Sequence, residues 1–512
     1  MKALVVGSGA GSLASALRLR ARGFEVEVLE ACPDPGGRAR TFTFHGESFD
    51  AGPTVITAPW LFDELFELFG EQRRDHIEFV PCDPWYRLQF ADGSSMDLVA
   101  GVDRQEREIA KISPRDAQRY RAYLQHSEEL YRVGYEELGA FDFSGVLSMA
   151  RVFPALFKLG GFRSLWRHTG RYFEDDRVRQ AFSLQTLLVG GNPLTTTAIY
   201  GLIHAMERRG GIWFAKGGTG RLIEALVDLA RRHGVRFTFG ARVDEIVTAP
   251  GGGVTGIGAM LEEHRYHAPG DLLVWGGDPE VLYWILGGAR TSLVERLRAK
   301  TVQSSMGLYV LYFKTAAAYH HVAHHTIVLS KRWHGLLRDV FRGQVLPNDP
   351  SLYLHRPAAT DPRASASGDL FYVLAPVPHL GNFTDWPAKE PGFRAQVLSI
   401  LEERILPGLS QELQFAEAID PRYFRETLQS PLGAGFSIAP VLTQSAWFRF
   451  HNRADRVPNL YLCGAGVHPG GGLPGVVTSA KLVEKLVGDD LRQGRYKAGA
   501  AKPITSGFEE AA

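Results

Sequence analysis

Short apolar runs followed by glycine-rich turns recur along this chain, and one of them opens the sequence. Residues 3–6 (ALVV) are apolar and rich in branched side chains, which is typical of a buried parallel strand. Three glycines follow within five residues, and apolar side chains then repeat at helical spacing from Leu13 to Leu19. Residues 24–30 (FEVEVLE) read as a second strand that ends on an acid. This order predicts a strand, a glycine-rich turn, a helix and a second strand.

The turn between these two strands has the chemistry of a dinucleotide site. Gly7 permits a tight turn, and Gly9 lets the backbone approach a pyrophosphate because it has no Cβ. The helix that opens at about Gly11, directly after Ala10, points free N–H groups and its positive dipole end at that anion. Glu30 ends the second strand about 20 residues on, where an acid accepts hydrogen bonds from ribose hydroxyls. The sequence therefore predicts a bound dinucleotide without a 2′-phosphate.

Later segments return to the same sheet. Residues 235–239, 271–278 and 459–466 each place an apolar run before or near a glycine-rich turn. Val243, in the segment that follows the first of these runs, is a candidate for a backbone contact to an adenine. Residues 468–477 (HPGGGLPGVV) lead into a helix predicted over 478–491. That helix offers a second N-terminus to the cofactor.

A second region has the pattern of a sheet that faces an apolar ligand. Residues 85–98 predict a β-hairpin whose turn is Asp92-Gly93. Between about 302 and 455, four further runs read as strands, namely 308–313, 326–329, 352–355 and 371–375. Tyrosine, phenylalanine, leucine and proline are frequent there.

Length, charge and cysteine content narrow the class of protein. A chain of 512 residues predicts two to four structural units. The net charge of +1 provides no bulk electrostatic reason to bind nucleic acid. Cys32, Cys82 and Cys463 lie far apart, which favours reduced thiols rather than disulfides. No apolar run approaches the roughly 20 residues of a membrane-spanning helix, and the first strand leaves no room for a signal peptide, so we expect a protein on the cytoplasmic side.

Two further segments suggest contact with a membrane and binding of a metal, respectively. Residues 141–167 mix bulky apolar side chains with Arg151, Lys158, Arg163 and Arg167, as in a segment that lies in a membrane interface, although two helices packed on the protein's own core explain the pattern too. The histidine-rich run 320–325 suggests a metal. No cysteine or carboxylate accompanies these histidines at ligand spacing, so we predict that no metal is bound.

Residues 35–39 (PGGRA) and 50–54 (DAGPT) narrow the choice among dinucleotide cofactors. A Gly-Gly-Arg turn that includes Gly37 and Arg38 places N–H groups and a guanidinium near a second anion, which suits a diphosphate. Together with the first glycine-rich turn, these pieces resemble the FAD-binding end of the amine-oxidase and carotenoid-desaturase superfamily.

The resemblance extends over nearly the whole chain, to bacterial carotenoid desaturases of the phytoene desaturase type. It rests on the segments 49–57 (FDAGPTVIT), 187–193 (LLVGGNP), 211–220 (GIWFAKGGTG), 372–380 (YVLAPVPHL), 440–451 (PVLTQSAWFRFH) and 459–475. This chain departs from the family pattern at three places. Ser12 replaces the third fingerprint glycine, Val467 stands where Thr is usual, and residues 275–278 (WGGD) stand where Ser-Asn-Ala-Asp is usual.

The resemblance implies an α/β fold with a Rossmann-like FAD-binding domain assembled from discontinuous segments, a mixed-sheet substrate domain and a helical, membrane-contacting subdomain. We assign residues 1–75, 214–285 and 456–495 to the first, 76–140 and 286–455 to the second, 141–213 to the third, and 496–512 to a disordered tail. The expected FAD contacts are Gly7, Gly9, Ala10, Gly11, Glu30, Gly37, Arg38, Gly52, Pro53, Thr54, Val243, Gly464, Ala465, Gly466, Pro474, Gly475 and Val476.

The implied reaction is a stepwise, FAD-dependent dehydrogenation of phytoene towards neurosporene or lycopene. Because such a polyene dissolves in lipid, the resemblance also implies peripheral attachment to a membrane, with residues 141–167 as the candidate surface, and quinone or oxygen as the electron acceptor. A later-pathway desaturase of hydroxylated or apocarotenoid substrates, a redox-neutral carotene isomerase and a lipid carrier on the same fold are the alternatives. The catalytic base is not identified, and we expect structural roles for Asp142, Glu174 and His204.

Overall fold

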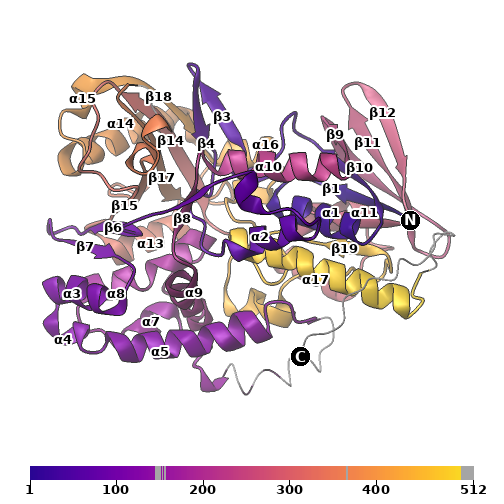
Figure 1. Ribbon diagram of the computed structural model, residues 1–512, viewed down its shortest axis with the longest axis horizontal. Helices are drawn as coiled ribbons and strands as arrows, with labels where there is room; N and C mark the ends of the chain where they lie inside the picture. Colours follow the sequence, from indigo (N-terminus) through magenta and orange to yellow (C-terminus); the bar gives the residue numbers. More distant parts are fainter. Residues whose placement is uncertain (144–151, 153, 155–156, 365–366, 497–512) are drawn as a thin grey trace.

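The computed structural model describes residues 1–143, 152, 154, 157–364 and 367–496. Arg151 and the predicted disordered tail, apart from Tyr496, lie outside the described residues, as does much of the segment 141–167. Figure 1 shows the yellow α17 (Leu473–Arg492) beside the indigo α1 (Ala10–Ala21), so a helix near each end of the chain packs against the other. The domain boundaries given above stay predictions.

A five-stranded parallel sheet forms the centre of the half of the molecule that contains α1 and α17. Its order is β19-β13-β1-β2-β9. The strands are β1 (Lys2–Val6), β2 (Glu25–Glu30), β9 (Arg236–Phe239), β13 (Leu272–Trp275) and β19 (Leu460–Leu462). All five predicted strands are confirmed. Most residues of β1, β13 and β19 are buried, which explains why these three strands are continuous apolar runs, whereas β2 (EVEVLE) and β9 (RFTF) alternate polar and apolar residues.

Different layers cover the two faces of this sheet. On one face, α1, α17 and α10 (Thr219–Arg232) pack against Ala3 and Val5. On the other face, Leu4 and Leu29 pack against a three-stranded antiparallel sheet of β10 (Ala241–Thr248), β11 (Val254–Leu261) and β12 (His264–Pro269). The strand-like segment at 241–246 was predicted, but β11 (VTGIGAML) and β12 (HRYHAP) were not, because glycines interrupt the apolar residues of the first, and histidines and an arginine those of the second.

The second half is built on a seven-stranded sheet of order β18-β14-β17-β16-β15-β6-β7. Its strands are β6 (Tyr86–Gln89), β7 (Ser95–Leu98), β14 (Gly307–Thr315), β15 (His325–Val328), β16 (Leu352–His355), β17 (Asp369–Val377) and β18 (Leu413–Ile419). The predicted hairpin and the four predicted strands are confirmed, and β18 was missed. Alternate residues of β14 face opposite layers: Tyr309 packs towards α14 (Trp386–Arg404), whereas Leu308 faces the interior between the two sheets.

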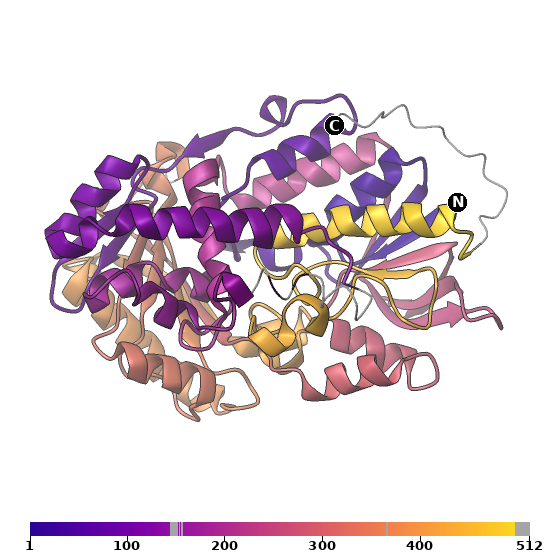
Figure 2. The same ribbon diagram turned by 90° about the horizontal axis from the view of Figure 1, so that it is seen from below.

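The remaining helices are distributed around these sheets. They are α2 (Trp60–Glu67), α3 (Val102–Ile112), α4 (Pro114–Ala117), α5 (Tyr120–Tyr131), α7 (Leu165–Thr169), α8 (Asp176–Ala181), α9 (Leu202–Gly210), α11 (Pro279–Leu286), α12 (Leu293–Thr301), α13 (Trp333–Arg342), α15 (Leu409–Glu412) and α16 (Pro421–Glu426). Short strands pair as β3 (Thr41–Phe44) with β4 (Glu47–Asp50), and as β5 (Phe79–Pro81) with β8 (Trp213–Ala215). In Figure 2, α5 and α17 follow one another along one side of the molecule. No helix among the described residues is long and apolar enough to cross a membrane.

Candidate active site

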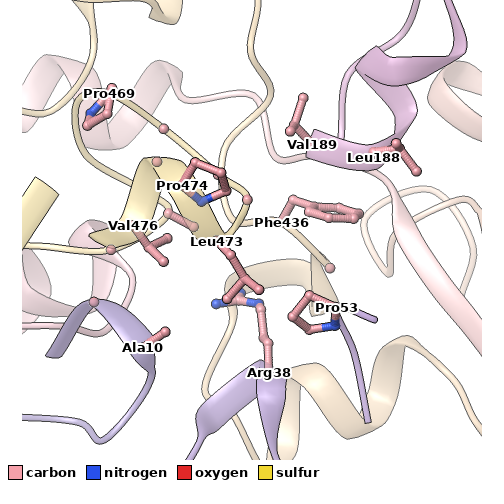
Figure 3. Close-up of a pocket in the computed structure, with 18 of the residues that line it drawn as sticks. Ala10, Arg38, Pro53, Leu188, Val189, Phe436, Pro469, Leu473, Pro474 and Val476 are labelled. Atoms are coloured by element: carbon pink, nitrogen blue, oxygen red, sulfur yellow. The ribbon is translucent and has the colours of Figure 1, made fainter. Parts of the chain in front are cut away.

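One large apolar cavity connects the two sheets. Its volume is about 1130 Å³, and its wall contains both the glycine-rich turns of the parallel sheet and side chains of the seven-stranded sheet, such as Leu308 and Leu374. Figure 3 shows Arg38 and Pro53 facing Leu473, with Phe436 beside them. The cavity therefore joins the predicted dinucleotide site to a long apolar compartment.

The N-terminal and C-terminal glycine-rich segments are in close contact at Gly11. A Cβ built on Gly11 would lie 3.1 Å from the carbonyl oxygen of Val476 and 3.3 Å from Cα of Gly464. The helix predicted from residue 478 begins five residues earlier, at Leu473, with Pro474 in its first turn and Gly472 before it. This correction places Pro474, Gly475 and Val476 at the helix N-terminus, where proline is well tolerated and N–H groups are free for a ligand.

The first glycine-rich turn has the predicted geometry. Gly7 has a φ of +92°, a conformation that L side chains rarely adopt. The N–H of Gly36 donates to the carbonyl oxygen of Ser8 over 3.0 Å, so the Gly-Gly-Arg turn packs against the first one. The carboxylate of Glu30 lines the cavity and accepts hydrogen bonds from the N–H and hydroxyl of Ser8 (2.7 and 2.6 Å) and from the N–H of Cys32 (2.8 Å). It therefore also holds the turn in place, and its contact with a ribose stays a prediction.

Arg38 and Gly52 form the next part of the wall. A Cβ on Gly52 would lie 2.0 Å from the carbonyl oxygen of Arg38, so no larger residue fits there without a backbone shift. The Arg38 Nη2 donates to Ser430 Oγ (2.9 Å) and to Asp278 Oδ2 (3.3 Å). Its Nε is buried and has no hydrogen-bond partner. A buried donor without a partner is costly, which fits an anionic ligand at this position.

The C-terminal loop is held by residues that the sequence analysis did not single out for that role. Arg449 is fully buried, and it donates to the carbonyl oxygens of Ala465 (2.6 Å, from Nη2) and Val467 (2.9 Å, from Nε). His468 Nε2 lies 2.8 Å from the carbonyl oxygen of Leu138, and burial lowers the pKa of this histidine to about 4. His468 is therefore neutral at physiological pH. The sequence alone does not indicate this arrangement, because Arg449 lies 16 residues before Ala465.

The expected FAD contacts converge on one cavity, with one exception. All of them except Gly466 line its wall. Gly466 instead packs against Pro279, the first residue of α11. A Cβ built on Gly466 would lie 2.3 Å from Cδ of Pro279. The site fits a dinucleotide: it has two helix N-termini, close-approach glycines and the unpartnered Arg38 Nε. Each individual contact with FAD stays a prediction.

The apolar compartment contains one carboxyl group that no cation neutralises. Glu207 lines the cavity, its Oε1 accepts a hydrogen bond of 3.2 Å from Tyr86 OH, and the side chain of Gln185 lies next to the carboxyl group. Burial raises the pKa of Glu207 to about 8, so the group is mostly protonated at neutral pH. Sequence reasoning missed Glu207 because it lies on a helix with ordinary polar residues around it.

The residues for which we expected structural roles lie outside this cavity wall. His204 is buried, and its Nε2 is 3.0 Å from Tyr120 OH. Glu174 forms ion pairs with Arg115 and Arg119 near the surface. Asp142 lies 3.5 Å from Arg453. None of the three lines the cavity formed by the described residues.

The histidine-rich run lies on β15 and in the loop before it, next to the cavity. His324 and His325 are buried beside His355, and Cys82 joins them from a distant part of the chain. Sequence spacing gave no indication that Cys82 lies here, because the fold alone brings it to the histidines. The prediction that no metal is bound stays a prediction.

Comparison with known proteins identifies the site. Residues 11–312 match the family model of flavin-containing amine oxidoreductases. The chain is 41% identical over 502 residues to a lycopene-forming phytoene desaturase of Pseudescherichia vulneris, covering 96% of this chain and 100% of that one. It is 37% identical over 500 residues to a neurosporene-forming phytoene desaturase of Rhodobacter capsulatus, covering 95% and 94%. An oxidoreductase from Methanosarcina mazei has the same fold, with a TM-score of 0.65 at 17% identity over 95% of this chain and all of that one. The chain therefore belongs to the flavin-containing amine oxidoreductase family, in its phytoene desaturase branch, and is an oxidoreductase whose cofactor is FAD.

Proposed function

We propose that this protein desaturates phytoene in steps towards neurosporene or lycopene, using FAD. The observation that carries the proposal is the single cavity of about 1130 Å³ in which the FAD-binding turns open into an apolar compartment. An apolar compartment suits a hydrocarbon, because its walls offer few hydrogen-bond partners that would be left unpaired. The phytoene desaturases of Pseudescherichia vulneris and Rhodobacter capsulatus match this chain over nearly its whole length.

The main contribution of the protein to this reaction is to orient the substrate. When bound, a flavin accepts a hydride from the substrate, and the protein must hold an allylic C–H bond against the ring in a dry environment. Val189, Phe436 and Leu473 provide apolar surfaces on the compartment side of the FAD-binding loops. They keep water away and leave the substrate little freedom of orientation.

We also propose that the mouth of the cavity faces a membrane. Phe157 and Phe162 line the cavity although their side chains are 58% and 50% exposed, so they lie where the cavity opens. Leu442 and Phe448, whose side chains are 48% and 43% exposed, combine cavity lining with exposure in the same way. Exposed apolar side chains around an opening would be stabilised by lipid, from which a polyene can enter without crossing water.

Cations accompany this apolar rim. Lys158 is exposed, and the guanidinium of Arg163 lies 4.7 Å from the ring centre of Phe162. This combination is typical of a surface that binds anionic lipid. Within the predicted segment 141–167, Lys158, Phe162 and Arg163 support the proposal. Arg151 lies outside the described residues. A membrane quinone or oxygen is the proposed electron acceptor.

A second candidate substrate class is an oxygenated or shortened carotenoid. Glu207 favours it, because a mostly protonated carboxyl group on the cavity wall can donate a hydrogen bond to a substrate hydroxyl or carbonyl. A pure hydrocarbon offers no such acceptor.

Anaerobic turnover in liposomes separates these functions. The FAD-loaded protein is given phytoene in one sample and a hydroxylated or aldehyde-bearing carotenoid in another, and products and flavin absorbance are followed together. We expect loss of phytoene, longer conjugated products and bleaching of the flavin. Unchanged phytoene with turnover of the oxygenated substrate would establish the second candidate. Isomerised product without net two-electron transfer indicates an isomerase, and a protein that takes up no flavin indicates a carrier.

A further inference from the structure

A continuous set of hydrogen bonds leads from the FAD-binding turn into the buried histidines. Thr54 directly follows Pro53, which lies beside Arg38 in the pocket of Figure 3. The hydroxyl oxygens of Thr54 and Tyr353 are 2.5 Å apart, and the Tyr353 oxygen is 2.7 Å from Nδ1 of His325. Thr54 and His325 are buried, and Tyr353 lines the cavity.

Strand register creates this contact. On the adjacent strands β15 and β16, His325 is paired with His355. Tyr353 is two residues before His355, and side chains two residues apart on a strand lie on the same face. Tyr353 therefore reaches from the cavity wall to His325, while its hydroxyl stays in contact with Thr54.

The other side of His325 continues the polar path away from the cavity. Its Nε2 lies 3.9 Å from the sulfur of Cys82, and the half-buried Thr360 lies next to that thiol. His324 and His355 are in contact through their Nε2 atoms at 3.0 Å, and the rings of His324 and His325 are 4.4 Å apart. A group of neutral, buried imidazoles can accept and release a proton at each ring without a large movement.

The resting protonation states set the direction of the hydrogen bond between Tyr353 and His325. Burial, with His355 nearby, lowers the pKa of His325 well below its usual 6.5, so the ring is neutral at rest. Burial also raises the pKa of Tyr353 well above 10, so the phenol keeps its proton and donates a hydrogen bond to Nδ1. Both shifts oppose a lasting charge on either group, so His325 holds an added proton only transiently.

The other titratable groups on the cavity wall fit this role less well. Glu30 accepts three hydrogen bonds from its own turn, and Asp278 faces the guanidinium of Arg38. Glu207 is mostly protonated at neutral pH and is therefore a poor acceptor. Among the carboxyl and imidazole groups on the described part of the wall, the neutral His468 remains as a rival base.

We propose that Tyr353 and His325 carry away the proton that each desaturation step removes from the substrate. This inference rests on the desaturation proposed above. In each step one carbon loses a hydride, with its electron pair, to the flavin, which is the oxidant. The neighbouring carbon loses a proton, and the electrons of that C–H bond form the new π bond. The proton passes to the Tyr353 oxygen as the Tyr353 proton moves to His325 Nδ1, and Thr54 orients the phenol.

The test is single-turnover reduction of the flavin by phytoene under anaerobic conditions, in H₂O and in D₂O. The variants are Tyr353→Phe and His325→Gln, with Tyr309→Phe as the control, because Tyr309 is a buried tyrosine of the same sheet that faces away from the cavity. We expect both test variants to slow flavin reduction by about 10²-fold to 10⁴-fold and to lose the solvent isotope effect of the wild type. Flavin content and phytoene affinity should stay within twofold, and Tyr309→Phe should behave as the wild type.

A second measurement needs neither flavin nor substrate. In thermal unfolding of the apoprotein, Thr54→Val and Tyr353→Phe should each lower the midpoint, and the double variant should lose less than the sum, because both remove the same hydrogen bond. Additive losses would contradict the contact on which the path depends.

The remaining outcomes overturn the proposal or a specific part of it. Wild-type-like flavin reduction in Tyr353→Phe, or loss of the isotope effect in His468→Asn alone, would overturn the role of Tyr353 and His325 while leaving the desaturation intact. Stoichiometric zinc in the purified protein that disappears in Cys82→Ala would also overturn it, because a metal-bound imidazole keeps its other nitrogen protonated. A wild-type protein that leaves phytoene unchanged would instead overturn the proposed function.

Discussion

The hydroxyl of Ser12 occupies the space beside Gly276: a Cβ built on Gly276 would lie 1.8 Å from Ser12 Oγ. Ser12 stands where the family has glycine, and Gly276 stands where the family usually has Asn. The two departures therefore complement each other across the contact between α1 and the turn after β13. They explain how the FAD-binding turn keeps its shape without the third fingerprint glycine.

This contact predicts the effect of Gly276→Ala. The added methyl group collides with Ser12 Oγ, and overpacking of this kind costs about 1–3 kcal/mol. Thermal unfolding and flavin absorbance should both report a loss. Ser12→Gly in the same chain should restore part of it, because the carbonyl oxygen of Val6, 2.9 Å from the same Cβ, remains. Gly251→Ala, in open space, is the control, and equal losses in both variants would contradict the prediction.

Arg449 is expected to control the retention of FAD. Arg449→Met leaves the carbonyl oxygens of Ala465 and Val467 without their buried donor, and each such group costs about 1–3 kcal/mol. The loop that lines the FAD site should then loosen, so that gel filtration separates protein from flavin. Arg456→Met, an exposed arginine nearby, should retain FAD as the wild type does. Full flavin occupancy in Arg449→Met would show that the loop does not need this anchor.

Glu207 predicts a pH-dependent loss of stability. Its pKa is about 8 in the folded protein and near the ordinary 4.5 in the unfolded chain, so the folded state binds the extra proton between these values. Stability from this group is therefore complete below about pH 4.5 and is lost as the pH rises to about 8, at most by about 1.4 kcal/mol per pH unit.

Glu207→Gln removes this titration and keeps the shape of the side chain. Denaturant unfolding midpoints of the variant should rise relative to the wild type from pH 5 to pH 8 and run parallel above that range. A difference that does not change with pH would mean that Glu207 has the same pKa in the folded and unfolded states.

Charge reversal at the cavity mouth tests the membrane surface. Lys158→Glu with Arg163→Glu should weaken sedimentation with anionic vesicles, because each cation near such a surface contributes about 1 kcal/mol. Arg242→Glu with Arg338→Glu makes the same change in charge at two exposed sites away from the mouth and is the control. Equal vesicle binding by the two double variants would remove this surface from consideration.

Local sequence determined the parts of this protein that depend on neighbouring residues. The strands β1, β13 and β19 were predictable because each is a short, buried apolar run, whereas β2 and β9 alternate apolar and polar residues. Gly7 was predictable because the turn after the first strand needs a positive φ. Glu30 was placed correctly because strand length and helix length fix its distance from that turn. Helix α17 was found, but its start was misplaced by five residues because the glycine-rich segment before it conceals the first turn.

Only the tertiary structure decided which distant residues meet. Gly466 looked like its neighbours in sequence but faces Pro279 rather than the cavity, and β11 and β12 have no continuous apolar run to reveal them. The contact of Ser12 with Gly276, the anchoring of Ala465 by Arg449 and the approach of Tyr353 to His325 each join separate segments. Such contacts arise from strand register and packing between layers, and because neither leaves a period along the chain, the sequence pattern alone does not contain them.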